Sequence, residues 1–228
     1  MTAAASQPLF DWAYARAVLP TLLEGLAITV QATLLGMVLA VTLGLVLALM
    51  RRAPLRPVAW GAARAYAQAL VIEFVRSTPL LMQLFFLFYV LPVTGVRFSP
   101  LATGVLGLGV HYAAYCAEVY RAGLDSVPRG QWEAALALNL GRWRTLRDVI
   151  LPQAIPPIVP ALGNYFVAMF KDTPLLSAIT VVELLQASKI AGSATFRYTE
   201  PLTLVGLIFL ALSLAAAWGV RRLGARLR

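Results

Sequence analysis

Charged residues are scarce in this sequence, where Asp, Glu, Lys and Arg together make up 13% of 228 residues. Soluble domains carry about 25% charged and about 45–50% apolar residues. This chain is 60% apolar and has a mean hydropathy of +0.78. Its apolar runs are continuous and lack the alternation of a membrane β-barrel. The composition therefore excludes an ordinary soluble domain and predicts an all-α protein that crosses a membrane several times.

Residues that carry chemistry are equally scarce. The single cysteine, Cys116, excludes an intrachain disulfide and a cysteine-based metal cluster, and the single histidine, His111, excludes a histidine-rich metal site. Both lie in apolar sequence and are expected to be packed helix residues. The sequence has no GxxxxGK(S/T) phosphate-binding loop, so we do not expect it to hydrolyse ATP. We expect no catalytic residue, metal site or cofactor in this chain.

Five apolar stretches are long enough to cross a bilayer, which takes about 20 helical residues at about 1.5 Å each. With no internal repeat, they predict one transmembrane domain over residues 1–228. The expected spans cover residues 22–50, 66–91, 101–124, 150–170 and 201–219. The residues before the first span are expected to form an interfacial lead-in bounded by Pro8 and Pro20. Residues 175–198 predict a re-entrant or peripheral helix.

Glycines and prolines add detail to these spans. The glycines of the first span allow other helices to approach closely; they are Gly25, Gly36 and Gly44. The second span is interrupted at Pro79, which cannot donate to the helix and disfavours helical backbone at Thr78. We expect one kinked span there, with two half-spans as the alternative.

The net charge of +9 is concentrated in short arginine clusters between the apolar stretches. Residues 51–64 contain four arginines, residues 121–147 five and residues 221–228 four. This is the pattern of the positive-inside rule rather than of a nucleic-acid-binding surface. We therefore expect the N-terminus outside the cell, and the C-terminus in the cytoplasm, in a bacterial cell (inner) membrane, with no nucleic acid partner.

The segment between the third and fourth spans, residues 125–149, is the only long charge-bearing stretch between strongly apolar ones. Pro128 can open a helix, and good helix formers follow it. An apolar stripe with spacing i, i+3, i+4 and i+7 consists of Trp132, Ala135, Leu136 and Asn139. A helix this short is marginal in water, so either the bilayer surface or a soluble partner must hold it.

The segment also contains a spaced motif made of Glu133, Ala134, Ala135, Val149, Leu151 and Pro152. It resembles the EAA loop of the permeases of binding-protein-dependent ABC importers. The family pattern is Glu-Ala-Ala, three residues, Gly, nine residues, Ile, one residue, Leu-Pro. The family's glycine is Asn139 here. Because asparagine is the next best residue for a positive φ, and Gly141 follows it, we expect the turn to be kept.

The resemblance implies a fold like that of the type I ABC importer permeases and a set of partners. A cytoplasmic ABC ATPase dimer, which uses ATP and Mg, would bind the helix of this loop. A second, paralogous permease subunit would complete the pathway as a heterodimer, and a periplasmic or extracellular solute-binding protein would deliver the solute. The residues implied in ATPase coupling are Gln131, Trp132, Glu133, Ala134, Ala135, Leu136, Asn139, Gly141, Leu151 and Pro152.

Further motifs extend the resemblance to nearly the whole chain. Residues 74–81, 117–124, 126–131 and 151–154 are similar to the polar amino-acid branch of these permeases. Residues 107–112, 137–140, 164–171 and 196–201 resemble, more narrowly, the D-type subunit of ectoine/hydroxyectoine permeases. The resemblance implies import of a small zwitterion, with ectoine or hydroxyectoine first. The alternative is a polar amino acid such as glutamine, glutamate, arginine or histidine.

Polar and ionisable residues at membrane depth are candidates for the solute pathway, because hydrocarbon disfavours them. Glu73 and Arg76, for example, lie three residues apart and so share a helix face. Mutual pairing that only packs the helices is the alternative. The pathway candidates are Glu73, Arg76, Thr78, Gln83, Asn164 and Lys171.

Two other classes of membrane protein compete with this interpretation. A membrane-embedded enzyme would need a nucleophile, metal ligands or paired carboxylates at one depth, and no such spacing occurs in the sequence. A channel or secondary carrier would usually be longer and show inverted repeats. Both are therefore less consistent with the sequence than a transport subunit whose ATPase is a separate protein.

Overall fold

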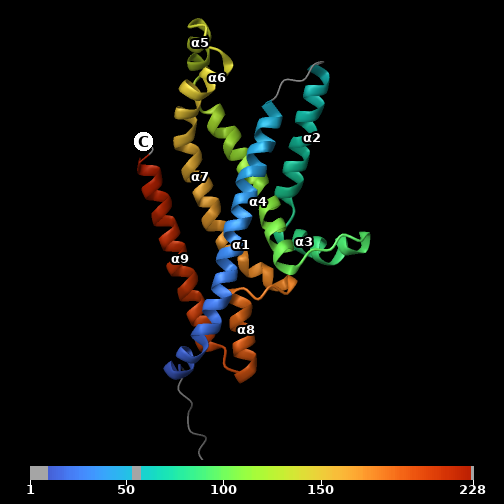
Figure 1. The fold of residues 1–228 in the computed structure, drawn as a ribbon, viewed down its shortest axis with the longest axis vertical. Coiled ribbons are helices and arrows are strands. Elements are labelled where there is room, and N and C mark those ends of the chain that lie inside the picture. Colours follow the sequence, from blue (N-terminus) through green and yellow to red (C-terminus); the bar gives the residue numbers. More distant parts are fainter. Residues whose placement is uncertain (1–9, 53–57, 227–228) are drawn as a thin grey trace, which may run out of the picture.

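A computed structural model of the protein describes residues 10–52 and 58–226, and within these ranges it is helical and contains no strand (Figure 1). The α-helices are α1 (Trp12–Arg52), α2 (Val58–Ser77), α3 (Leu80–Phe85), α4 (Pro100–Asp125), α5 (Arg129–Ala137), α6 (Arg142–Arg144), α7 (Leu151–Asp172), α8 (Leu184–Thr195) and α9 (Thr199–Arg226). Short π and 3₁₀ helices join them: η1 (Phe86–Val90), η2 (Leu91–Thr94), η3 (Thr145–Ile150) and η4 (Thr173–Ile179).

The long helices fit a bilayer. In the described part of the chain, α1 and α9 are each long and apolar enough to cross it, and two bent pairs, α2 with α3 and α7 with α8, raise the number to four. Helix α4 has 26 residues, about 39 Å at 1.5 Å per residue, and lies beside α1 (Figure 1). The predicted all-α, membrane-spanning fold is confirmed.

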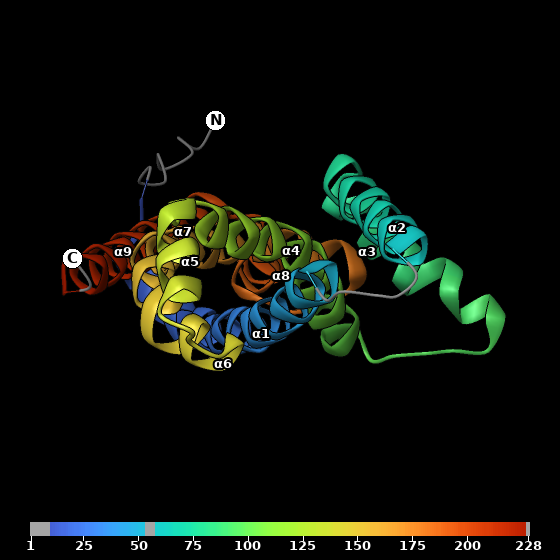
Figure 2. The same ribbon diagram turned by 90° about the horizontal axis from the view of Figure 1, so that it is seen from above.

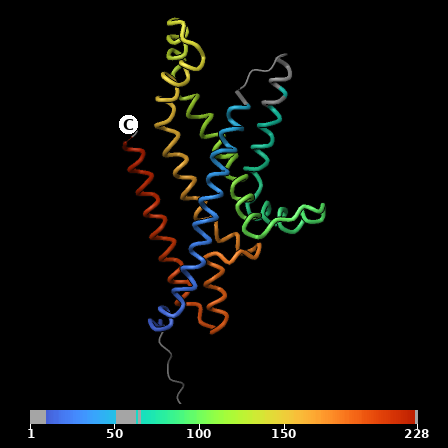
Figure 3. Tube along the Cα trace, viewed as in Figure 1, coloured from blue at the N-terminus to red at the C-terminus, as the bar shows by residue number. Residues whose placement is uncertain are grey.

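The two ends of the helical bundle differ. Figure 3 shows α5, α6 and the end of α9 at one end, which we call the α5 end. The start of α1, helix α8 and the start of α9 lie at the other, the α8 end. The first and last described residues therefore lie toward opposite ends of the bundle.

The core depends on close packing of α1 against α4. The two helices run in the same direction, and Gly44 of α1 faces Cys116 of α4. A Cβ atom added to Gly44 would lie 2.6 Å from the Cβ of Cys116 and 2.9 Å from the carbonyl oxygen of Ala113. Cys116 is fully buried in this core together with Leu108 and Met169. The predicted packing roles of the glycine and of the cysteine are confirmed.

Helix α1 begins at Trp12, about ten residues before the predicted first span, and Pro20 lies inside it instead of bounding a lead-in. Proline removes one hydrogen bond from a helix. Here the neighbouring Val18 and Leu22 are buried against α8 and α9, and this packing keeps the helix continuous. Pro8 lies outside the described residues.

The second predicted span, 66–91, is not one kinked helix. Helices α2 and α3 meet at an angle of 101°. Pro79 stands at the N-cap of α3 in extended backbone, with φ −61° and ψ 134°, so the helical ladder stops at Ser77. Seen from above in Figure 2, α3 and the chain that follows it extend away from the other helices as an arm. The alternative of two half-spans is closer to the structure.

The remaining predicted elements lie near their expected positions. Helix α4 matches the predicted span 101–124 within one residue at each end, and α7 matches 150–170 within two. Helix α9 is longer than 201–219, because it continues through the arginines of the tail to Arg226. The weakly apolar stretch 175–198 forms most of η4 and all of α8.

The α1–α4 contact gives a first prediction. The substitution Gly44→Leu should lower the free energy of unfolding by about 3 kcal/mol or more, because backbone atoms of α4 block the new side chain. Thermal unfolding of the purified chain in detergent measures the effect. Gly206→Leu in α9 is the control, because nothing lies within 4 Å of a Cβ added at Gly206. Equal unfolding midpoints for the two variants would contradict this packing.

Candidate functional site

The segment at the α5 end has one face turned toward the rest of the chain. Trp132 packs against a buried cluster that includes Leu124, Val127 and Ile150. Ala135 is only 2% exposed. The predicted stripe of Trp132, Ala135, Leu136 and Asn139 is therefore split. Its first two members anchor α5 to α4 and α7, because a 3.6-residue period identifies the buried face of a helix but not what buries it.

The other face of the segment is exposed and partly apolar. Leu136 is 76% exposed, Leu138 73% and Trp143 70%. The remaining predicted coupling residues of α5 are exposed as well; they are Gln131, Glu133 and Ala134. Leu138 and Trp143 were missed in the sequence because they lie outside the regular stripe. This face can bind a partner without disturbing the buried anchor.

Asn139 makes the turn that ends α5. Its φ is +57°, its own N–H donates to the carbonyl of Leu136, and the N–H of Leu140 donates to the carbonyl of Ala135 at 3.0 Å. This is the Schellman arrangement, in which glycine usually takes the left-handed position. The expectation that asparagine keeps the turn is confirmed, whereas Gly141 has an ordinary φ of −61°.

The segment is tied to the start of α7. Leu151 packs in the same cluster as Trp132, while Pro152 is exposed in the first turn of α7. The side-chain nitrogen of Gln153 donates to the Val149 carbonyl at 2.7 Å and to Oε1 of Gln131 at 3.4 Å. A displacement of α5 would therefore be transmitted to α7.

Two of the polar candidates, Thr78 and Gln83, form hydrogen bonds that bridge the break between α2 and α3. Nε2 of Gln83 donates to the carbonyl oxygens of Val75 at 2.8 Å and Thr78 at 3.2 Å. It also contacts the Thr78 hydroxyl, while Oε1 of Gln83 meets Nδ1 of His111 at 3.2 Å. These carbonyls have lost their helical partners, so Thr78 and Gln83 stabilise the bend and have little capacity left for a solute.

Beside the bend, α2, α4 and α7 bring rings and charges together. The guanidinium of Arg76 lies 5.2 Å from the centroid of the Tyr115 ring, which is 5.3 Å from that of Tyr165. The Tyr112 hydroxyl donates to Oδ2 of Asp172 at 2.7 Å. We call these five residues the tyrosine cluster. Arg76 was among the predicted pathway residues, whereas Asp172 and the tyrosines were not; the only signal for the tyrosines is the spacing of 112 and 115 on one helix face.

The other candidates lie around this cluster. Glu73 and Arg76 form an ion pair of 3.5 Å in which both side chains are more than a third exposed. Asn164 and Lys171 are exposed and seven residues apart, so they lie on one face of α7. Such groups are disfavoured against lipid, so this face is suited to water or protein. Among the described residues, no group of three or more His, Cys, Asp or Glu could hold a metal.

Comparisons with known proteins place this geometry in context. Residues 40–228 match the family described as binding-protein-dependent transport system inner membrane component. The chain is 51% identical over 211 residues to the probable amino-acid ABC transporter permease protein y4tG of Sinorhizobium fredii, covering 92% of this chain and 89% of that protein. It is 33% identical to the glutamine transport system permease protein GlnP of Escherichia coli, covering 96% and 98%.

A solved structure agrees with these relatives. The crystal structure of an amino acid ABC transporter with histidines superposes with a TM-score of 0.86 at 33% identity, over 95% of this chain and 99% of that one. The fold and the sequence therefore lead to the same group of proteins.

The repair of the α2–α3 break gives a second prediction. Gln83→Leu should lower the free energy of unfolding by about 1–3 kcal/mol, because the carbonyls of Val75 and Thr78 lose a donor. The measurement is again thermal unfolding in detergent. Gln31→Leu, at an exposed position of α1, should leave the midpoint unchanged. An equal loss in both variants would mean that the bend does not depend on Gln83.

Proposed function

The chain belongs to the family of binding-protein-dependent transport system inner membrane components and is a permease subunit of an ABC transporter, and from this premise we propose that it moves a polar amino acid into the cell. It is an integral protein of the inner membrane whose transport is driven by ATP hydrolysis in a partner subunit. We propose further that the α5 end lies in the cytoplasm and the α8 end outside, since the arginines of α5, α6 and the end of α9 lie at the former.

The tyrosine cluster is the observation that supports an amino acid as the solute. A free amino acid carries one positive and one negative group, and Asp172 and Arg76 offer a partner for each within one cluster of tyrosine rings. Asn164 and Lys171 extend this polar surface along α7. The relatives above are named for amino acids or glutamine. We therefore place a polar amino acid ahead of ectoine or hydroxyectoine.

The exposed face of the α5 segment supports docking of an ABC ATPase dimer. Leu136, Leu138 and Trp143 would enter its surface, and Glu133 would add a charged contact at the rim. Because Trp132 and Ala135 anchor α5 to α4 and α7, movement of the ATPases would reach the membrane helices directly. ATP and Mg would be bound by that partner.

A second permease subunit, proposed to be a paralogue, would cover the arm made by α3, η1 and η2. The groove between α2, α3 and α4 has a volume of about 720 Å³ and an almost entirely apolar lining. Along the arm Met82, Phe86 and Val93 are 57% or more exposed. In a permease pair this surface and the polar face of α7 would close around the solute pathway.

Uptake by the complete transporter in proteoliposomes tests the solute. We expect labelled glutamine, glutamate, arginine or histidine to accumulate when ATP is inside, and ectoine not to accumulate. Asp172→Asn should reduce the amino-acid uptake about tenfold or more, because a charged contact is worth about 1.5–3 kcal/mol.

Asp148→Asn is the matched control, because the Asp148 side chain is 59% exposed at the α5 end. Its uptake should equal that of the unchanged protein. Accumulation of ectoine alone would overturn the proposed solute, and equal uptake by both aspartate variants would remove Asp172 from the pathway.

Two variants of α5 test the coupling surface. Leu136→Ala should weaken binding of the purified ATPase about fivefold to tenfold without changing the unfolding midpoint, because the Leu136 side chain is 76% exposed in the chain. Trp132→Ala should instead lower the free energy of unfolding by about 2 kcal/mol or more, because it removes the anchor. The opposite pattern would place Trp132, rather than Leu136, at the ATPase.

A further inference from the structure

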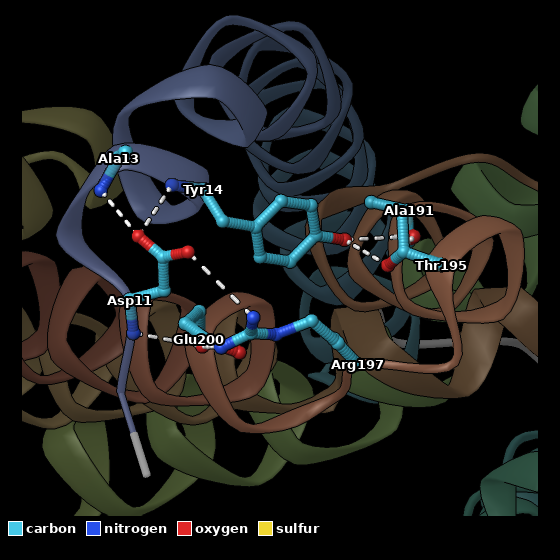
Figure 4. A network of polar contacts seen from close by, with 7 residues as sticks. All are labelled: Asp11, Ala13, Tyr14, Ala191, Thr195, Arg197 and Glu200. Carbon is cyan, nitrogen blue, oxygen red and sulfur yellow. Dashed lines mark hydrogen bonds and ion pairs between the residues drawn. The ribbon is translucent and has the colours of Figure 1, made fainter. Parts of the chain in front are cut away.

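A network of polar contacts joins three helices at the α8 end (Figure 4). Glu200, only 1% exposed at the start of α9, accepts the backbone N–H of Asp11 at 2.9 Å and the guanidinium of Arg197. Nη1 of Arg197 also lies 3.6 Å from Oδ2 of Asp11. The start of α1 is thereby fixed to the turn between α8 and α9.

Tyr14 strengthens the same junction from α1. Its hydroxyl donates to the carbonyl oxygen of Ala191 at 3.0 Å and lies 2.7 Å from Oγ1 of Thr195. The Arg197 guanidinium lies 5.6 Å from the centre of the Tyr14 ring. Figure 4 shows these groups converging from α1, α8 and α9. The turn after α8 is therefore held on a rigid base.

This rigid turn contains an exposed aromatic residue whose backbone conformation is strained. Phe196 has a φ of +55° and is 89% exposed. Its N–H and that of Arg197 both donate to the carbonyl of Gly192, which ends α8. Glycine usually takes this left-handed position, because a side chain there crowds the backbone. In the chain alone, neither the strain nor the exposed ring brings any stability, and strained residues tend to occur at functional sites.

The surroundings of Phe196 indicate water rather than hydrocarbon. The exposed stripe of α8 that leads to it contains Lys189 and Ser193. The ionic groups of Arg197 and Asp11 are next to it. The exposed residues in the middle of α9, between 206 and 219, are in contrast apolar and include Leu207, Leu210 and Leu214. Lipid suits this part of α9, and a soluble protein surface suits the mixed stripe of α8.

We propose that the turn between α8 and α9 is a docking point for the solute-binding protein, with Phe196 as its central contact. The inference rests on the proposed function, because it takes the α8 end to face outside. The family is binding-protein-dependent by its description, so a soluble partner must approach the end opposite the ATPase. An exposed aromatic ring on a rigid base is the kind of residue that dominates protein interfaces.

The test uses the complete transporter in lipid nanodiscs. Purified solute-binding protein of the same transport system, loaded with its solute, is titrated while ATP hydrolysis is measured. Phe196→Gly should raise the concentration for half-maximal stimulation at least tenfold. It should leave the maximal rate unchanged and the unfolding midpoint equal or higher, because glycine accepts a positive φ without strain. Trp12→Ala is the control, since Trp12 is 71% exposed at the same end and should not alter the titration.

The outcomes separate the two proposals. Stimulation of the unchanged transporter with an identical titration for Phe196→Gly would overturn the docking point alone. No stimulation of the unchanged transporter would count against the proposed function itself. A lipid anchor is tested with Phe196→Trp in nanodiscs of brominated lipid. Strong quenching of its fluorescence that the binding protein does not relieve would assign the ring to the membrane and overturn the proposal.

Discussion

Hydrocarbon offers no partner to a free peptide group, and two breaks between the described helices of this protein are arranged around that constraint. Between α2 and α3, Gln83 donates to the carbonyls that Pro79 leaves open. Before α8, the fully buried Glu183 accepts the N–H groups of Leu185 and Gln186, and Thr29 of α1 accepts that of Leu184 at 3.1 Å. Because side chains complete the backbone hydrogen bonds, the chain can bend inside the bilayer where a pathway needs irregular walls.

The extent to which these features follow from sequence depends on how local their causes are. The bounds of α4 and α5, and the left-handed turn at Asn139, result from neighbouring residues and were predictable. The angle at Pro79 was not, because it depends on what packs against α3. The contact of Asp11 with Glu200 joins residues 189 apart, and one sequence carries no signal for such a pairing. The tyrosine cluster is hidden for the same reason, because its members come from three helices.

The α5 segment shows why a helical stripe does not by itself identify a docking surface. Trp132 was predicted to contact a partner, and in the structure it is partly buried against the cluster that holds α5 in place. To transmit movement from a partner to α7, helix α5 needs both a contact with the partner and an anchor on the rest of the chain. A loosely attached helix would move without moving α7. The buried face of this short helix therefore holds it to the chain, and the exposed face is available to a partner. The apolar residues of the exposed face do not follow the regular helical spacing, because only a partner would pack against them.

At each end of the bundle a helix ends at a residue in the left-handed conformation, but the type of that residue differs between the two ends. At the α5 end the left-handed position is taken by Asn139, which tolerates a positive φ. At the α8 end it is taken by Phe196, which does not, and a network of three charged residues and Tyr14 holds the turn closed. A turn needed only to reverse the chain would be satisfied by asparagine or glycine. The aromatic ring at Phe196 therefore requires a reason outside the isolated chain, and a soluble partner at that end supplies one.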